Sequence, residues 1–381
     1  MCTWFCFCVI LIIPRRTAKG CALRIKGEKI FMNNIEYFKT SGYGMMMHFG
    51  LYSLLGGEYR GKFGDNYAEW IGSHFAIPIK EYEQLAKAFN PIYFDAEEII
   101  RFAKECGMGY FVVTAKHHDG FALFRSEADK YNVVDATPFG RDIIGEFAAA
   151  CKKYGVRLGL YYSQDLDWHD PNGGGYLSNH MGCSGVTWDN SWDFPDPAKK
   201  DFSVCFENKI LPQVRELMSN YGDIFLAWFD VPMTMTAEQS QKLYETVHSL
   251  QPDCLVNSRI GNGVYDYVSL NDNEIPESKE DWLRQCSVDP STIDYRSING
   301  FKPSRYGLYE SACTLNRSWG FSYRDHNWVS PETLCENRKK LNEMGINYLV
   351  NVGPDHLGRI PGPSMDVLRK AAELFRGQEG R

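Results

Sequence analysis

The sequence has 381 residues, 44% hydrophobic and 23% charged, so its apolar mass suffices for a globular core. The formal net charge of −7 argues against nucleic acid or an anionic membrane as partner. Twelve cysteines without a C-x-x-C pair, in a chain this long, are typical of reduced, mostly buried thiols rather than a disulfide framework or a zinc site. This pattern predicts a reducing, cytoplasmic compartment.

The first 31 residues differ in character from the rest. An apolar run, Cys2–Ile13, precedes Pro14, Arg15 and Arg16. The run is too short to span a bilayer, and its positive charges follow it, unlike those of a secretory signal. Three interpretations stay open: a signal-anchor remnant, a disordered tail, or a mis-assigned start. We favour the last and predict residues 1–31 as a separate segment, 32–381 as one domain, and no stable membrane insertion.

From about residue 35, short apolar runs alternate with amphipathic stretches. The predicted strands are Gly44–Gly50, Tyr110–Ala115, Leu158–Ser163, Ile224–Asp230, Cys254–Arg259, Leu308–Thr314 and Tyr348–Val352, with a weaker eighth at Trp319–Tyr323. The predicted helices are Lys80–Phe89, Asp95–Cys106, Asp142–Tyr154, Lys209–Tyr221, Ala237–Leu250, Pro331–Met344 and Ser364–Phe375. Asp95 is a plausible N-cap and Gly155 a plausible glycine after a helix end.

This alternation predicts an α/β fold, and the strand number favours a closed (β/α)8 barrel over an open sheet. A dinucleotide-binding fold has no support, because no G-x-G-x-x-G run follows the first strand.

Polar residues recur where the predicted strands end, which is where barrel enzymes build their active sites. They are His48, Lys116 to Asp119, Tyr162 with Asp165, Asp167 and Trp168, Asp230, Asn257 with Arg259, and Glu310. A single such residue could be a buried polar group whose hydrogen bonds are satisfied within the core. Polar residues at the ends of six strands favour an active site. Asp230 follows an apolar strand, so its carboxylate needs partners or a function. The pair His117–His118 suits hydrogen bonding to substrate hydroxyls better than metal binding, because the first strand has only His48 and no H-x-H.

Several runs resemble, in order, the motifs of family 29 glycoside hydrolases, the α-L-fucosidases. They are MMMHFGLYSL (45–54), NYAEWIG (66–72), FVVTAKHHDGFALFRS (111–126), GLYYSQDLDW (159–168), AWFD (227–230), VNSRIG (256–261), YESACTLNRSWGF (309–321) and NYLVNVGPDHLGRIP (347–361). The likeness covers roughly residues 38 to 361. It implies a catalytic barrel domain that hydrolyses terminal α-L-fucosyl residues of glycans with retention, without metal or cofactor.

The resemblance implies a role for individual residues. Asp230 matches the nucleophile. The positions that match ligands of the fucose ring are His48, Glu69, Trp70, His117, His118, Tyr162 and Arg259, with Trp319 against the C5 methyl group. For the general acid/base we favour Glu310, in a context similar to the family's W-E segment, over Glu274 in NDNEIPE.

Two departures put the natural substrate in doubt. Most members carry a C-terminal β-sandwich after the barrel, which this sequence does not show, and the segment 278–305 is longer than expected. Three rivals stay open: a barrel hydrolase of another sugar such as α-galactoside, a metal-dependent amidohydrolase, and a fucose-binding relative without activity. The sequence predicts neither the fucosyl linkage nor the oligomeric state.

Overall fold

The computed structural model describes residues 23–25, 28–30, 33–64, 67–177, 186–280, 283 and 303–379. The chain divides into two compact units, Met1–Asn33 and Asn34–Arg381. In the first unit, β1 (Leu23–Ile25) and β2 (Glu28–Ile30) pair antiparallel. The predicted division at residue 31 stays a prediction. Asn66 of the NYAEWIG motif and most of the long segment 278–305 lie outside the described residues.

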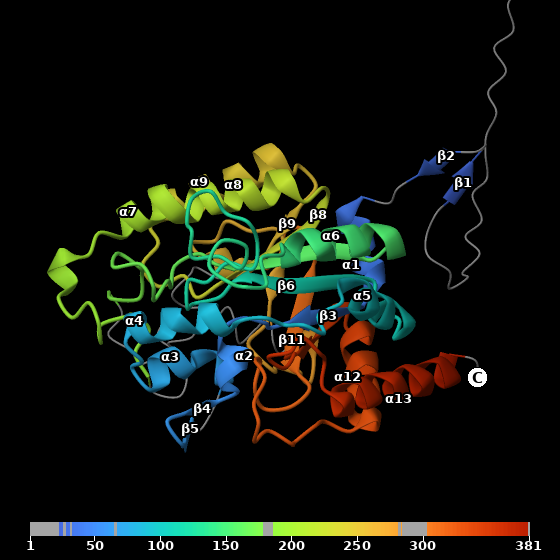
Figure 1. The fold of residues 1–381 in the computed structure, drawn as a ribbon. Coiled ribbons are helices and arrows are strands. Elements are labelled where there is room, and N and C mark those ends of the chain that lie inside the picture. Colours follow the sequence, from blue (N-terminus) through green and yellow to red (C-terminus); the bar gives the residue numbers. More distant parts are fainter. Residues whose placement is uncertain are drawn as a thin grey trace, which may run out of the picture. The chain divides into compact units, whose positions relative to one another are not determined.

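The second unit is built on eight parallel strands whose order around the sheet follows the chain (Figure 1). They are β3 (Tyr43–Met47), β6 (Tyr110–Lys116), β7 (Arg157–Ser163), β8 (Ile224–Asp230), β9 (Leu255–Val256), β10 (Val268–Ser269), β11 (Tyr309–Thr314) and β12 (Ile346–Val352). β12 pairs with β3, and one parallel bridge, Asn257 to Tyr267, joins the ends of β9 and β10. The predicted (β/α)8 class is confirmed, with one closing seam much thinner than the others.

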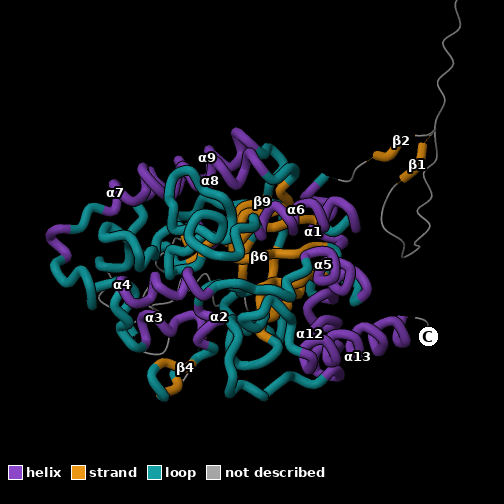
Figure 2. The backbone as a smooth tube through the Cα atoms, in the orientation of Figure 1, coloured by secondary structure: helices purple, strands orange, loops and turns teal. Residues whose placement is uncertain are grey.

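The described helices lie around the sheet (Figure 2). They are α1 (Asn34–Ser41), α2 (Tyr52–Leu55), α3 (Ile71–His74), α4 (Ile79–Tyr82), α5 (Ala96–Glu105), α6 (Ile143–Tyr154), α7 (Phe202–Cys205), α8 (Leu211–Asn220), α9 (Ala237–Leu250), α12 (Pro331–Glu343) and α13 (Gly362–Glu379). Shorter elements are the hairpin β4 (Glu58–Tyr59) and β5 (Lys62–Phe63), the 3₁₀ helices Ala68–Trp70, Glu83–Ala88, Pro197–Lys199 and Ser258–Ile260, and a π-helix, Phe206–Ile210. Neighbouring helices pack in pairs, α5 on α6, α8 on α9 and α12 on α13.

The predicted helix ends are confirmed where capping side chains mark them. The Asp95 carboxylate accepts a hydrogen bond of 3.0 Å from the Glu98 N–H at the start of α5. Gly155 follows α6 with φ +66°, a left-handed conformation that costs glycine little. Local chemistry therefore fixes where these helices begin and end.

Three predicted elements differ from the structure in type or extent. The predicted strand Cys254–Arg259 is the two-residue strand β9 followed by the 3₁₀ helix Ser258–Ile260. Trp319–Tyr323 is a loop, and the eighth strand is β10, whose two residues are too few to show a strand pattern. The predicted helix Lys80–Phe89 is divided between α4 and the 3₁₀ helix Glu83–Ala88.

The inside of the barrel is filled mainly by large aromatic side chains. Phe38 of α1 lies against the rings of Tyr110 and Tyr267, at centroid distances of 6.5 and 5.1 Å. Gly44 makes room for Tyr110, because a Cβ there would lie 2.5 Å from that ring. A packed interior leaves a hollow only where the strands end.

Candidate active site

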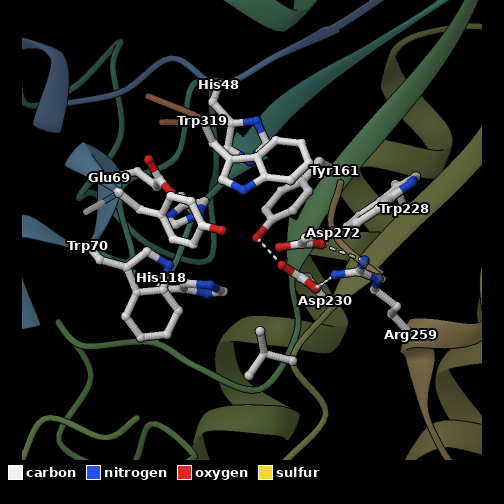
Figure 3. Close-up of a pocket in the computed structure, with 13 residues that line it drawn as sticks. His48, Glu69, Trp70, His118, Tyr161, Trp228, Asp230, Arg259, Asp272 and Trp319 are labelled. Atoms are coloured by element: carbon white, nitrogen blue, oxygen red, sulfur yellow. Dashed lines mark hydrogen bonds and ion pairs between the residues drawn. The ribbon is translucent and has the colours of Figure 1, made fainter. Parts of the chain in front are cut away.

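A pocket of about 360 Å³ lies at the carboxyl ends of the barrel strands (Figure 3). Its lining residues are His48, Tyr67, Glu69, Trp70, His117, His118, Tyr161, Trp228, Asp230, Val231, Arg259, Asp272 and Trp319. Eight of the predicted site residues are among them, and three, Tyr162, Glu310 and Glu274, are not.

Asp230 is the last residue of β8, and its carboxylate faces into the pocket. It accepts hydrogen bonds from the Tyr161 hydroxyl, at 2.9 Å, and from Arg259 Nη1, at 3.1 Å. Burial raises the pKa of Asp230, whereas the Arg259 guanidinium lowers it in part. These two donors favour a carboxylate that is ionised and fixed in direction.

Arg259 connects two carboxylates. Its Nη2 donates to Asp272 Oδ1, at 2.6 Å, and to the Leu270 carbonyl, at 2.8 Å, while its Nη1 holds Asp230. The Asp272 side chain is 31% exposed, against 13% for Asp230. The pocket therefore has one carboxyl group deep inside and one nearer to solvent, on adjacent nitrogens of one guanidinium.

Asp272 is the main residue that the sequence analysis missed. It follows the two-residue strand β10, in the same N-D-N-E run that contains Glu274. Beyond β10 the chain continues beside β11, since the Leu270 and Asn273 N–H groups donate to the carbonyls of Glu310 and Ala312. This path carries Asp272 to the rim of the barrel.

Glu310 lies inside the barrel, outside the residues that line the pocket. It is the second residue of β11, paired with Ser269, and it is fully buried. Its two oxygens accept from the Tyr110 hydroxyl, at 2.7 Å, and from Trp228 Nε1, at 2.9 Å. Burial raises the pKa of Glu310 to about 7. This carboxyl group supports the Trp228 ring, which itself lines the pocket.

Glu274 also lies outside the pocket lining. Its Oε2 accepts a hydrogen bond of 3.0 Å from the Asn271 N–H, within its own turn, and its carbonyl accepts one from Ser311. The run that contains Glu274 thus contributes Asp272 to the pocket instead.

The structure places Tyr161, rather than the predicted Tyr162, in the pocket. Successive side chains of a strand point to opposite faces, so only one of the two tyrosines of β7 can face inward. The Tyr162 hydroxyl donates to Gln213 Oε1 of α8, at 2.7 Å, on the outer side of the barrel. Both faces of β7 are buried and apolar, so the sequence has no alternation that identifies the inward residue.

The three histidines of the pocket are held neutral. Burial lowers the pKa of His48 to about 4 and the pKa values of His117 and His118 well below 6.5. His48 Nδ1 lies 2.7 Å from Asn351 Oδ1, and His118 Nδ1 lies 2.7 Å from Ser163 Oγ. The His48 and His118 rings therefore each have one nitrogen engaged and present a fixed face to the pocket.

Two buried polar atoms of the pocket lack a hydrogen-bond partner among the described residues. They are Glu69 Oε1 and His117 Nδ1. The other oxygen of Glu69 accepts from the Gly320 N–H, at 2.7 Å, and burial raises the pKa of this carboxyl group to about 7. Buried polar atoms are rarely left without a partner, so both atoms suit a ligand rich in hydroxyl groups.

Aromatic rings form the walls of the pocket. Trp319 lies 5.2 Å from the His48 ring and Trp70 lies 4.9 Å from the His118 ring, between centroids. The Trp319 carbonyl accepts a hydrogen bond of 2.7 Å from Asn351. Apolar walls with convergent polar groups are typical of a small-molecule site. Among the described residues, no cluster of three or more His, Cys, Asp or Glu could hold a metal ion.

Comparisons with known proteins agree with this geometry. Residues 28–377 match the family model described as Alpha-L-fucosidase. The chain is 33% identical to a putative α-L-fucosidase of Caenorhabditis elegans, over 88% of this chain and 64% of that protein. It is 25% identical to the α-L-fucosidase of Dictyostelium discoideum, over 86% of this chain and 66% of that protein. The chain thus spans less than two thirds of these curated relatives.

Solved structures give a similar result. The unliganded α-L-fucosidase AlfC from Lactobacillus casei is 58% identical, with a TM-score of 0.83, over 91% of this chain and 99% of that one. A mutant of AlfC in complex with Fucα(1,6)GlcNAc matches with 57% identity and a TM-score of 0.82, over 91% and 100% of the two chains. These matches confirm the resemblance read from the motifs, and the chain belongs to the α-L-fucosidase family of glycoside hydrolases.

Proposed function

We propose that this chain is an exo-acting α-L-fucosidase that works by double displacement, with Asp230 as nucleophile and Asp272 as general acid/base. The observation that carries the proposal is the pair of carboxyl groups held by Arg259 inside one pocket. Retaining glycosidases need two carboxyl groups about 5–5.5 Å apart, one for attack and one for proton transfer. Glu310 and Glu274, the residues favoured from sequence, lie outside the pocket lining.

The charge of the cluster suits this division of roles. With both carboxyl groups ionised, Asp230, Asp272 and Arg259 carry a net charge of −1, and with one proton added the charge is zero. A partly buried site favours the neutral state, and the proton belongs to the pair rather than to one residue. Asp230 has the Tyr161 hydroxyl as a further donor, which favours its ionised form. Asp272 has the more exposed side chain of the two, which suits proton exchange with the aglycone and with water.

In the first step, an Asp230 oxygen forms a bond to the anomeric carbon while the bond to the leaving oxygen breaks. Asp272 gives its proton to that oxygen, and the products are a fucosyl ester and a free alcohol. In the second step, Asp272 takes a proton from water, the water oxygen bonds to the anomeric carbon, and Asp230 leaves as a carboxylate. The greater exposure of Asp272 fits this order, because both the aglycone and the water are on the solvent side.

The other pocket residues suit the sugar ring. The neutral histidines and the Glu69 carboxyl group offer donors and acceptors for hydroxyl groups. The Trp319 ring offers an apolar surface for the C5 methyl group that distinguishes fucose from galactose. AlfC has been solved with α-L-fucose and with 4-nitrophenyl α-L-fucopyranoside bound, which supports an α-L-fucoside as substrate here.

The test is turnover of 4-nitrophenyl α-L-fucopyranoside by the wild type, Asp230→Ala and Asp272→Ala, with azide as external nucleophile. We expect the wild type to release fucose and each variant to lose about a thousandfold or more in the rate of hydrolysis. Azide restores Asp272→Ala with a fucosyl azide of retained configuration. With Asp230→Ala, any azide product has inverted configuration, because azide then replaces the nucleophile.

Three outcomes contradict the proposal. Near-normal hydrolysis by Asp272→Ala, together with azide rescue of Glu310→Ala or Glu274→Ala, would return the acid/base role to a glutamate. Preference for 4-nitrophenyl α-galactopyranoside would indicate another sugar. A wild type that binds fucose without turnover would indicate a binding protein.

A further inference from the structure

A buried amide side chain connects the two residues that meet at the centre of the pocket. Gln164 follows β7 and is fully buried. Its Oε1 accepts a hydrogen bond of 2.8 Å from the Asp230 N–H, and its Nε2 donates one of 2.9 Å to the Arg259 carbonyl. One carboxamide thus binds the backbones of both residues.

The end of β8 pairs regularly with β7, through Phe229 and Asp230, but not with β9 on its other side. β9 ends at Val256, after two residues paired with β8. Beyond it the Asn257 carboxamide accepts from the Phe229 N–H and donates to the Phe229 carbonyl, both at 2.9 Å. On the β9 side, the Asn257 carboxamide therefore takes the place of the backbone ladder beside Phe229, and Gln164 joins the end of β8 to the segment after β9.

The backbone after Asp230 needs such support. Val231 has φ +53°, a conformation that is strained for a β-branched residue, and it is buried against the pocket. Strain of this kind persists only where the surroundings hold it. On the far side of Val231, Asp165 Oδ2 accepts from the backbone N–H groups of Thr234 and Met235. Gln164 and Asp165, adjacent in sequence, thus hold the chain on both sides of the strained residue.

We infer that Gln164 is a positioning residue that sets Asp230 and Arg259 relative to each other. Its carboxamide fixes the two backbones so that Arg259 Nη1 lies 3.1 Å from Asp230 Oδ1. The inference rests on the proposed function, because it concerns the nucleophile and its arginine. Gln164 lies outside the pocket lining and acts only through these two residues.

Loss of this bridge changes the chemistry in a specific way. When Arg259 moves away from Asp230, its positive charge no longer offsets the effect of burial, so the pKa of Asp230 rises further. The acid limb of the pH profile of kcat/KM then moves to higher pH, because more of the nucleophile is protonated. The titratable groups that face Asp230 across the pocket are Tyr161, Arg259, Asp272, Glu69, His48, His117 and His118, and none of them is substituted in the variants below.

The matched variants are Gln164→Met and Gln213→Met. Gln213 is also fully buried and also makes two hydrogen bonds, one from the Tyr162 hydroxyl and one to Ser126 Oγ, on the outer side of the barrel. Both variants remove a carboxamide and nearly preserve side-chain length. We expect both to lower the thermal midpoint. Only Gln164→Met should lower kcat/KM for 4-nitrophenyl α-L-fucopyranoside per folded molecule, by about 10- to 100-fold, with the acid limb moved to higher pH.

A second pair keeps the test decisive if Gln164→Met does not fold. Gln164→Asn and Gln213→Asn keep a neutral carboxamide but shorten its reach by one methylene, so the bridge between two backbones is broken at one end. We expect a loss in kcat/KM and a moved acid limb for Gln164→Asn alone. Equal kinetics per folded molecule for the 164 and 213 variants would overturn the inference. A wild type inert toward the aryl fucoside would instead overturn the proposed function.

Discussion

Arg259 fixes the positions of two carboxyl groups, because each of its terminal nitrogens donates a hydrogen bond to one of them. It also lies over the Trp228 ring, with 4.8 Å from its guanidinium carbon to the ring centroid. Trp228 in turn donates to the buried Glu310. A chain of direct contacts therefore runs from Glu310 in the barrel interior to Asp230, the proposed nucleophile, and places Glu310 beneath the pocket wall, apart from the two carboxyl groups on Arg259.

The support role of Glu310 has a testable consequence at this scale. Glu310→Gln keeps the shape of the side chain but provides one oxygen for two donors, the Tyr110 hydroxyl and Trp228 Nε1. We expect a less stable protein that keeps at least about a tenth of the wild-type kcat/KM per folded molecule, a loss of at most about 1.4 kcal/mol, because Glu310 reaches the pocket only through the Trp228 ring. Kinetics with and without azide check this, and azide rescue would contradict it.

The Glu310→Gln variant also tests the raised pKa of Glu310. The pKa of Glu310 in the folded protein is about 7, above the ordinary value of 4.5, so the fold binds this proton more tightly than the unfolded chain. The stability that protonated Glu310 contributes is complete below about pH 4.5 and is lost as the pH rises through 7. The thermal midpoint of the wild type minus that of Glu310→Gln should therefore decrease from pH 5 to pH 8, and a constant difference would contradict the raised pKa.

At the scale of single elements, the helix caps show how local sequence fixes structure. Asp95 provides one cap hydrogen bond, to the Glu98 N–H, on the exposed side of α5. Asp95→Ala should lower the free energy of unfolding by about 1 kcal/mol, without effect on kcat or KM. Urea denaturation checks this, with Asp95→Asn as the control that keeps an accepting oxygen. A loss of catalytic rate in the alanine variant would show that α5 is coupled to the pocket.

The strands show how far prediction from sequence reaches. β8 is predicted with the correct bounds, because six apolar residues, Ile224 to Phe229, run directly into Asp230. β10 was missed because two residues carry no periodicity, and Asp272, which follows it, was missed with it. Tyr161 and Tyr162 could not be told apart, since both faces of β7 are buried. Residues at long, apolar strand ends were thus predictable, and residues whose position depends on the register of tertiary pairing were not.

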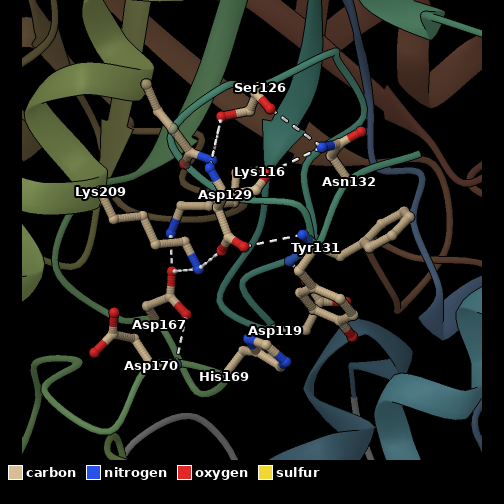
Figure 4. A network of polar contacts seen from close by, with 12 residues as sticks. Lys116, Asp119, Ser126, Asp129, Tyr131, Asn132, Asp167, His169, Asp170 and Lys209 are labelled. Carbon is tan, nitrogen blue, oxygen red and sulfur yellow. Dashed lines mark hydrogen bonds and ion pairs between the residues drawn. The ribbon is translucent and has the colours of Figure 1, made fainter. Parts of the chain in front are cut away.

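At the scale of the whole molecule, a buried ion network joins segments that are far apart in the chain (Figure 4). Asp167 Oδ2 lies 3.0 Å from Lys116 Nζ and 2.9 Å from Lys209 Nζ, and Lys209 also pairs with Asp129 at 2.6 Å. Burial alone would raise the pKa of Asp167, but the two lysines together hold it well below its usual range. The network connects the end of β6, the loops that carry Asp129 and Asp167, and the π-helix before α8.

Asp167→Asn should be strongly destabilising, because it leaves two buried ammonium groups short of negative charge. We expect a loss of about 3–5 kcal/mol in the free energy of unfolding, measured by urea denaturation. The control is Lys242→Met, which breaks an exposed pair with Glu207 at 2.8 Å and should cost at most about 1 kcal/mol. Similar losses for the two variants would show that the buried network contributes no more than a surface pair.

The seam between β9 and β10 has a consequence for how the barrel closes. β11 and β12 share six paired residues, whereas one bridge joins the ends of β9 and β10. Other bonds cross this seam: the Val256 carbonyl accepts from the Asp266 and Tyr267 N–H groups, and Arg259 reaches across to the Leu270 carbonyl and to Asp272. The guanidinium that holds the two carboxyl groups of the pocket thus also closes the barrel wall beside them.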